Sequence, residues 1–364
     1  MDGDARRAFA RGAARGCHIA LNIHDADGWV LGHEAFDADD YEDDVVMPDV
    51  ALDVERARVV RVSVTNVDSE DAKAAYVSVY DVACAGRRGR ELERGRTRDD
   101  RGRESECTTF IVIVPAKTLV HLCRVKLPAG TRAEDLRVES DVRAWARHSN
   151  PRDTHAQSVA FPLIGEKFLC TQSEGGELTH FFSGNLHAVD FRCDEGTPVV
   201  AAGDGVVVGV RDEHTLTGIA VGNLFAWNSI ILKLDARETT VGENERASAR
   251  DTGAGCSTTN GEEEDFSKRA TYDARGGDLY VEYVHIRAKS SKVRVGDRVR
   301  RGEVICYSGS VGFSPEPHLH FTAFRSADDT AETCRVLFEP ENDPRATYVP
   351  VAGRYYNAER GRVE

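Results

Sequence analysis

Two histidines separated by one residue stand out among the side chains that can do chemistry. His318 and His320 lie in the run Pro317-His318-Leu319-His320-Phe321. In a β-strand, residues two apart point to the same face, so we expect both imidazoles to share one pocket. Imidazole binds metals and carries protons near neutral pH. The pair alone is a weak signal, because two histidines on one strand are often structural.

Three further residues strengthen this signal. They are His180 in Leu178-Thr179-His180-Phe181, Asp190 in Ala188-Val189-Asp190-Phe191, and His285 in Tyr283-Val284-His285-Ile286. A catalytic zinc typically takes three protein ligands at about 2 Å and leaves its fourth position to water. An aspartate and two histidines fit this pattern, and the remaining histidines are available to move protons.

The bulk composition describes a soluble globular protein of two domains. The 364 residues are 41% hydrophobic and 30% charged, and no apolar run is long enough to cross a bilayer. The net charge of -14 argues against general binding to phosphate backbones, so we expect no nucleic-acid partner. The oligomeric state is left open.

Cysteines and the start of the chain give no targeting or redox signal. The nine cysteines contain no CxxC pair, and their disulfide state stays undecided. Cys193 follows Asp190 by three residues, so strand alternation directs it to the opposite face, into the core. The stretch from Met1 to Arg15 has acidic residues and no apolar segment, so no secretory signal is visible and the compartment stays open.

The elements that must position these residues are predicted to be strands. Residues 1–155 are predicted to form a β-rich, β-sandwich-like module. Its short β-branched runs are Arg58 to Thr65, Ala75 to Val82, Thr108 to Val114 and Thr118 to Leu127. A charged stretch near 86–106 is predicted to be a disordered loop, because it holds too little apolar area to order itself. The polar stretch from Arg147 to His155 is the expected domain boundary.

Residues 156–364 are predicted to form a second β domain. Its strand signals are Thr197 to Val210, Asn228 to Leu234, Leu279 to His285, Val293 to Val299, Val304 to Ser308 and His318 to Phe324. A polar stretch near 236–277 is predicted to be a disordered insertion. Glycines between the short strands are typical of tight turns that need a positive φ.

The second domain resembles the lysostaphin/LytM-type zinc metalloendopeptidases over roughly Phe161 to Arg325. The motifs that carry the likeness are Ala188-Val189-Asp190-Phe191, Gly196-Thr197-Pro198-Val199, Ala201-Ala202-Gly203-Asp204-Gly205, Tyr283-Val284-His285-Ile286, Gly302-Glu303-Val304-Ile305 and Pro317-His318-Leu319-His320-Phe321. The resemblance implies a mainly β fold: an antiparallel β peptidase domain of the barrel-sandwich, duplicated hybrid motif type, with a groove floored by the metal.

The resemblance also implies one zinc ion per peptidase domain. It assigns Asp190 and His320 as zinc ligands. The third ligand is His180, which matches a family form with Thr-His ahead of the aspartate, since Leu186 occupies the place of the histidine in the commoner form. His187 stays open as the alternative ligand.

His285 and His318 are the catalytic residues that the resemblance implies. The activity implied is hydrolysis of peptide bonds in Gly- or Ala-rich peptides, with peptidoglycan cross-bridges as the family's usual substrate. One imidazole would take a proton from the attacking water and the other would stabilise the transition state, in an order that the sequence does not fix. Glu316, where the family usually has glycine, adds a carboxylate that can alter substrate choice, and Val311 replaces a common threonine.

Two other classes of function stay open. One is a catalytically inactive peptidase-like domain that acts as a binding or regulatory module, although all five candidate metal-binding and catalytic residues are present. The other is a lipoyl- or biotin-type carrier, suggested by residues 293–309. The carrier would need a lysine with flanking Met or Ala at a hairpin tip, and none appears there.

Overall fold

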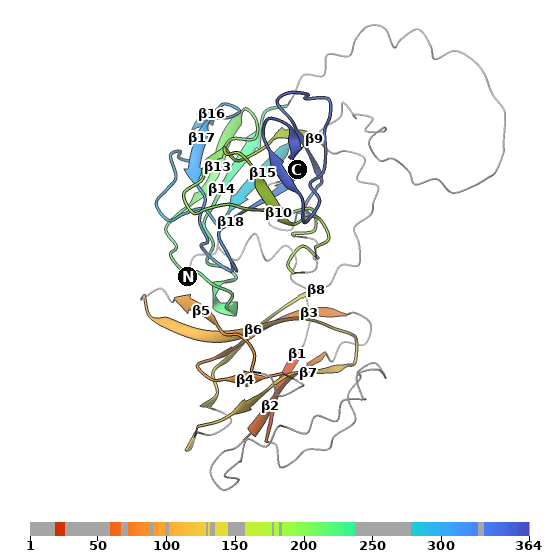
Figure 1. Ribbon diagram of the computed structural model, residues 1–364, viewed down its shortest axis with the longest axis vertical. Coiled ribbons are helices and arrows are strands. Elements are labelled where there is room, and N and C mark those ends of the chain that lie inside the picture. Colours follow the sequence, from red (N-terminus) through yellow and green to blue (C-terminus); the bar gives the residue numbers. More distant parts are fainter. Residues whose placement is uncertain are drawn as a thin grey trace, which may run out of the picture.

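The computed structural model describes residues 19–25, 59–66, 72–86, 91–98, 102–128, 130–131, 135–144, 157–176, 178–181, 184–236, 278–326 and 331–363. The described residues form two β-structured parts, one above the other in Figure 1. Among them, no helix is long and apolar enough to span a membrane. The predicted insertion near 236–277 falls almost wholly outside the described residues, as does the predicted boundary from Arg147 to His155.

The N-terminal part is a sandwich of two four-stranded sheets. The first sheet has the order β1-β2-β7-β4 and the second β5-β6-β3-β8. Their strands are Ile19–Asp25 (β1), Val59–Asn66 (β2), Lys73–Tyr80 (β3), Cys84–Ala85 (β4), Gly95–Arg98 (β5), Glu104–Val114 (β6), Leu119–Lys126 (β7) and Val138–Ala144 (β8). Val64 of β2 packs with Ala75 and Val77 of β3, which joins the two sheets through one core. The predicted β-sandwich-like module is confirmed.

The prediction of a disordered loop near 86–106 is wrong for residues 91–98 and 102–106, whereas residues 87–90 and 99–101 lie outside the described residues. Gly95–Arg98 forms β5 and pairs antiparallel with the start of β6. Ion pairs cross this hairpin, from Arg98 to Glu104 at 2.7 Å and from Arg94 to Glu106 at 2.7 Å. Backbone pairing to a neighbouring strand orders this stretch although it contributes little apolar surface, and composition alone does not reveal such pairing.

The C-terminal part is built on a nine-stranded sheet of order β16-β13-β14-β15-β18-β11-β10-β20-β21, with two small sheets, β12-β17 and β19-β9. The strands and one 3-10 turn are Gln157–Ala160 (β9), Phe168–Gln172 (β10), Val189–Arg192 (β11), Pro198–Val200 (β12), Gly205–Arg211 (β13), Val221–Asn223 (η4), Ser229–Leu234 (β14), Leu279–Val284 (β15), Arg298–Val299 (β16), Val304–Tyr307 (β17), His318–Phe324 (β18), Val336–Glu339 (β19), Tyr355–Asn357 (β20) and Gly361–Val363 (β21). The predicted antiparallel β domain is confirmed, although only the last two residues of the expected strand Val293 to Val299 form one.

Alternation along the central strands separates a core face from a groove face. Phe191, Phe321 and Tyr283 point into the hydrophobic core, where Phe161 and Phe338 pack against Phe191. The Tyr283 hydroxyl accepts a hydrogen bond there from the Ala202 backbone N–H at 2.7 Å. Residues between these positions on the same strands therefore face the other way, toward the site.

Candidate metal and catalytic site

Three neighbouring strands bring the chemical residues together. In the register of β11 with β18, Asp190 lies opposite His320, and in the register of β15 with β18, Val284 lies opposite His320. His318 and His320 share one face of β18, as their spacing predicts. The adjacent strand β10 ends at Gln172, and the turn that follows contains His180.

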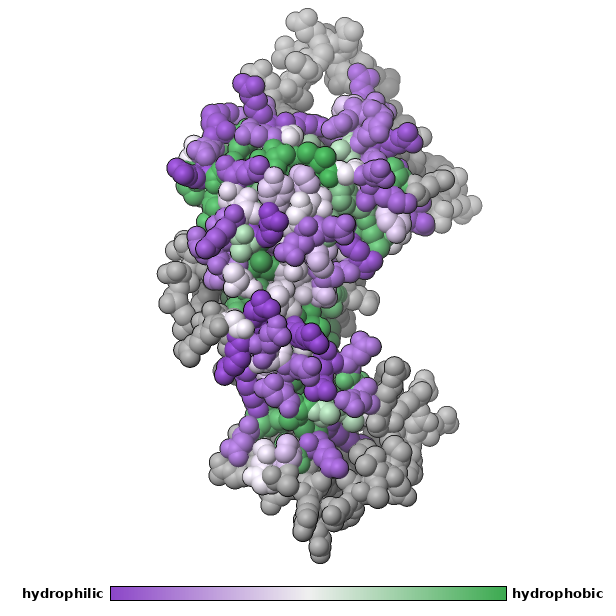
Figure 2. Space-filling model, turned by 60° about the vertical axis from the view of Figure 1, so that its left-hand side comes forward, coloured by the Kyte–Doolittle hydropathy of each residue, from purple (hydrophilic) through white to green (hydrophobic). Residues whose placement is uncertain are grey.

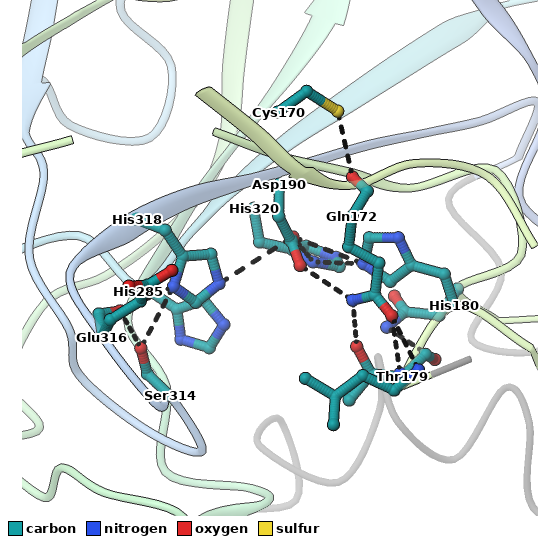
Figure 3. Close-up of polar contacts among 12 residues, drawn as sticks. Cys170, Gln172, Thr179, His180, Asp190, His285, Ser314, Glu316, His318 and His320 are labelled. Carbon is teal, nitrogen blue, oxygen red and sulfur yellow. Dashed lines mark hydrogen bonds and ion pairs between the residues drawn. The ribbon is translucent and has the colours of Figure 1, made fainter. Parts of the chain in front are cut away.

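His180, Asp190 and His320 form a compact group whose ligand atoms lie within 4.8 Å of one another. His320 Nδ1 lies 2.8 Å from Asp190 Oδ1, and His180 Nε2 lies 3.3 Å from both of these atoms. Ligand atoms held at about 2 Å around a tetrahedral zinc are separated by roughly 3.3 Å. The donor types and their spacing therefore fit one zinc ion, and Figure 3 shows the three side chains converging.

Gln172 supports this group, and the sequence patterns did not reveal it. Its side-chain amide Nε2 donates to Asp190 Oδ2 at 2.9 Å, on the carboxylate oxygen that faces away from His320. Its Oε1 accepts hydrogen bonds from the backbone N–H groups of Leu178 and Thr179. Gln172 thus fixes both the aspartate and the turn that carries His180. A glutamine at a strand end has no sequence signal; only the pairing of β10 with β11 brings it here.

His318 and His285 each tie Nδ1 to a backbone carbonyl. His318 Nδ1 donates to the Glu316 carbonyl at 2.8 Å and lies 3.1 Å from Ser314 Oγ. His285 Nδ1 donates to the Val311 carbonyl at 2.7 Å. Since a carbonyl only accepts, Nδ1 carries the proton in both neutral rings and Nε2 is left with a lone pair. The two ring centroids are 4.6 Å apart.

The backbone at His285 is unusual for a histidine. Its φ is 64°, in the left-handed region that residues with a Cβ adopt at a cost. The bend ends β15 and turns the imidazole toward His318 and His320. Local strain at this position is therefore linked to the placement of a ring in the site.

Burial and charge set the protonation of the site in the absence of a cation. Burial acts to raise the pKa of the Asp190 carboxyl, but the charges of His180 and His318 and the hydrogen bonds of His180 and His320 outweigh it and hold this pKa well below its ordinary range. Burial, with the neighbouring rings of His318 and His320, lowers the pKa of His285 well below its usual value. Asp190 is thus an anion and His285 a neutral imidazole at neutral pH.

All five predicted site residues line or adjoin one pocket of about 390 Å³. Its lining residues include Asp190, His285, His318 and His320. His180 is fully buried and adjoins the pocket through its contacts with Asp190 and His320. His187 lies elsewhere: its Nδ1 pairs with Glu174 at 3.0 Å, and it is outside the compact group. Cys193 lies in the core, and all seven described cysteines are buried and form no disulfide.

Comparison with known proteins adds a family to this geometry. The sequence pattern of Peptidase family M23 matches residues 258–331, a range that includes His285, His318 and His320 and lies downstream of His180 and Asp190. The C-terminal half is similar to peptidase family M23 over this range. A glycyl-glycine endopeptidase, ALE-1 of Staphylococcus capitis, is 51% identical to this chain over 39 residues, which are 11% of this chain and 10% of that protein.

Solved structures of M23 proteins are among those that this chain matches. The catalytic domain of lysostaphin from Staphylococcus simulans is 23% identical and the match covers 46% of this chain and 87% of that one, with a TM-score of 0.25. A mutant catalytic domain of the prophage-encoded M23 protein EnpA from Enterococcus faecalis is 16% identical, covering 48% and 92%, with a TM-score of 0.27.

Proposed function

We propose that residues 156–364 form a peptidase family M23 domain. This domain is a zinc-dependent endopeptidase that hydrolyses peptide bonds in Gly- or Ala-rich peptides, peptidoglycan cross-bridges included. The observation that carries this proposal is the compact group of His180, Asp190 and His320 beside the imidazoles of His285 and His318, inside one pocket. The short match to a glycyl-glycine endopeptidase supports a glycine-rich substrate. The division of the chain into residues 1–155 and 156–364 is part of the same proposal.

His180, Asp190 and His320 would hold the zinc ion through two nitrogens and one carboxylate oxygen. Zinc at such a site polarises a carbonyl group and lowers the pKa of a water molecule. Gln172 keeps Asp190 oriented by donating to its second oxygen. His187, paired with Glu174, has no part in this set.

The two remaining imidazoles would move the protons. Because Nδ1 of each ring is held by a backbone carbonyl, Nε2 is the nitrogen that can accept a proton from the attacking water. The imidazolium so formed donates that proton to the leaving amine. The second ring, when it carries a proton on Nε2 as well as on Nδ1, donates from Nε2 to the carbonyl oxygen and stabilises the negative charge that develops there.

The test is metal analysis followed by hydrolysis assays on the full chain. We expect one zinc per chain by mass spectrometry of the metal. We also expect cleavage of oligoglycine peptides and of peptidoglycan, loss of cleavage with a chelator, and recovery when zinc is returned. A chain that binds stoichiometric zinc and cleaves none of these substrates would contradict the peptidase proposal and leave only the metal site standing.

A further inference from the structure

A buried carboxylate beside the site has no partner. Glu282 lies on β15, is 3% exposed and lines the same pocket as the histidines. Among the described residues, no side chain forms a hydrogen bond or ion pair with it. Its cross-strand neighbour on β18 is Thr322, which is 2% exposed and whose Oγ1 is also unpartnered. Leaving a carboxylate buried without a countercharge is costly, so this pair calls for an explanation.

The register places these two side chains in the groove. Glu282 lies two residues before Val284, which is opposite His320, and Thr322 lies two residues after His320. Side chains two apart on a strand share a face, so Glu282 and Thr322 extend the floor of the pocket beyond His320. At a rise of about 3.4 Å per residue the step along the strand is roughly 7 Å, close to the length of two residues of an extended peptide.

The charges of the pocket leave Glu282 as the group that needs a cation. Its lining residues include the acidic side chains Asp190, Glu282 and Glu316, and no lysine or arginine. Asp190 is surrounded by imidazoles, and Glu316 is paired with Arg192 at 2.8 Å. A bound ligand is thus the natural source of the countercharge for Glu282.

We propose that Glu282 and Thr322 form a subsite for a primary ammonium group of the substrate peptide, about two residues from the bond that is cut. An ammonium has three donors, so it can satisfy the carboxylate and the threonine oxygen together. The group is either the side-chain amine of a diamino acid or the free amine at the peptide's N-terminus. The inference rests on the proposed peptidase function for its placement beside the cleaved bond.

Binding and turnover test this subsite separately. Glycine hexapeptides with both termini blocked are prepared with lysine, norleucine or Nε-acetyl-lysine as the second residue from the central bond, on either side. An all-glycine peptide with a free or acetylated N-terminus distinguishes the second source of the amine. Affinities are measured by calorimetry on the EDTA-treated full chain, and kcat/KM on the zinc-loaded chain.

We expect the unaltered chain to favour a peptide with a free amine over its neutral counterparts by about tenfold or more, in affinity and in kcat/KM. Glu282→Gln should remove this preference and leave the neutral peptides unchanged, and Thr322→Val should weaken it. The control Glu195→Gln, at an exposed carboxylate outside the pocket, should leave the preference intact.

Equal treatment of charged and neutral peptides by the unaltered chain would overturn the subsite, and this result needs no variant to fold. Loss of affinity for all peptides alike in Glu282→Gln would also overturn it. If no peptide is cleaved but the EDTA-treated chain still selects the amine through Glu282, the peptidase proposal fails and the subsite remains.

Discussion

Two imidazoles and a carboxylate of the site are each oriented by a neighbour outside the group. The Val311 and Glu316 carbonyls hold Nδ1 of His285 and His318, and Gln172 holds one oxygen of Asp190. These contacts divide the residues by role, because the proposed ligands converge on one point and the other two rings present Nε2.

That division predicts different losses for two neighbouring histidines. His320→Ala should remove zinc and activity together, since it deletes a ligand. His318→Ala should retain zinc and lower kcat by roughly a hundredfold to ten-thousandfold, the usual contribution of a positioned acid or base. Zinc content and kcat measured on the same preparations check both. Full hydrolysis by either variant would contradict the assignment.

Gln172→Ala is expected to weaken zinc binding by about tenfold to a hundredfold, because loss of an outer partner frees a ligand to reorient. The change also frees the Leu178 and Thr179 amides that position His180. Zinc affinity is measured by competition with a chromogenic chelator. Gln157→Ala, on β9 and away from the site, is the matched control and should bind zinc like the unaltered chain.

The sequence predicted the five principal residues because their spacing and neighbours form recognisable motifs. It did not predict Gln172, Ser314 or Glu282, whose positions depend on strand register and turn contacts. The motif resemblance favours His180 and leaves His187 open, whereas the fold places them apart: His180 lies with Asp190 and His187 with Glu174. The spacing of residues along the chain does not predict which side chains are brought together by strand pairing.

At the scale of elements, the strands were predicted best where β-branched runs are dense. The expected strands at Arg58 to Thr65 and His318 to Phe324 correspond to β2 and β18. The error at 86–106 has a physical cause, because β5 is polar and is ordered by pairing to β6 and by contacts with the C-terminal part. Contacts of this kind join residues that are distant along the chain, so a short stretch of sequence does not predict them.

Gly312, in the turn before β18, is expected to be important for stability. Gly312 has a φ of 100°, and a Cβ there would lie 2.8 Å from Trp227 Cβ and 2.9 Å from its Cα. Gly312→Ala should therefore lower the free energy of unfolding by about 2 kcal/mol or more, through backbone strain and the clash together. Gly296→Ala, with a φ of 96° and no atom within 4 Å, carries the strain alone and should cost about 1 kcal/mol. Chemical denaturation of both variants measures the difference between their free energies of unfolding. Equal losses would show that Trp227 shifts without cost to make room for the added Cβ.

At the scale of the whole molecule, the two parts are in direct contact close to the site. Val221 N–H donates to Ser78 Oγ at 2.9 Å, and Asn223 Nδ2 donates to Thr97 Oγ1 at 3.0 Å. Figure 1 shows the η4 turn, in green, facing the sandwich, and the molecule is narrowest between the two parts in Figure 2. Leu224, which follows η4, lines the pocket, so the junction and the groove share a wall.

Tyr76 of β3 links the sandwich to two segments of the site. Its ring stacks on Phe181, next to His180, at 6.3 Å, and meets Phe313, next to Ser314, edge-on at 5.9 Å. Tyr76→Ala should lower the free energy of unfolding by about 3–5 kcal/mol and reduce kcat/KM, because both phenylalanines lose their partner.

Thermal unfolding and peptide hydrolysis measure these two effects of Tyr76→Ala. The control is Tyr355→Ala, at a ring that is 39% exposed, for which we expect a change within about 0.5 kcal/mol. Unaltered turnover in Tyr76→Ala, together with the loss of stability, would show that the sandwich does not support the groove.

The order of strands in the nine-stranded sheet has a consequence for biosynthesis. Asp190 and His285 are translated long before the strand between them, β18, which pairs with both β11 and β15 and brings His318 and His320. Sheet pairing between such distant stretches completes late. A nascent chain in which β18 has not yet paired with β11 and β15 has no assembled centre, so hydrolytic competence would arise in one step, when β18 joins these two strands.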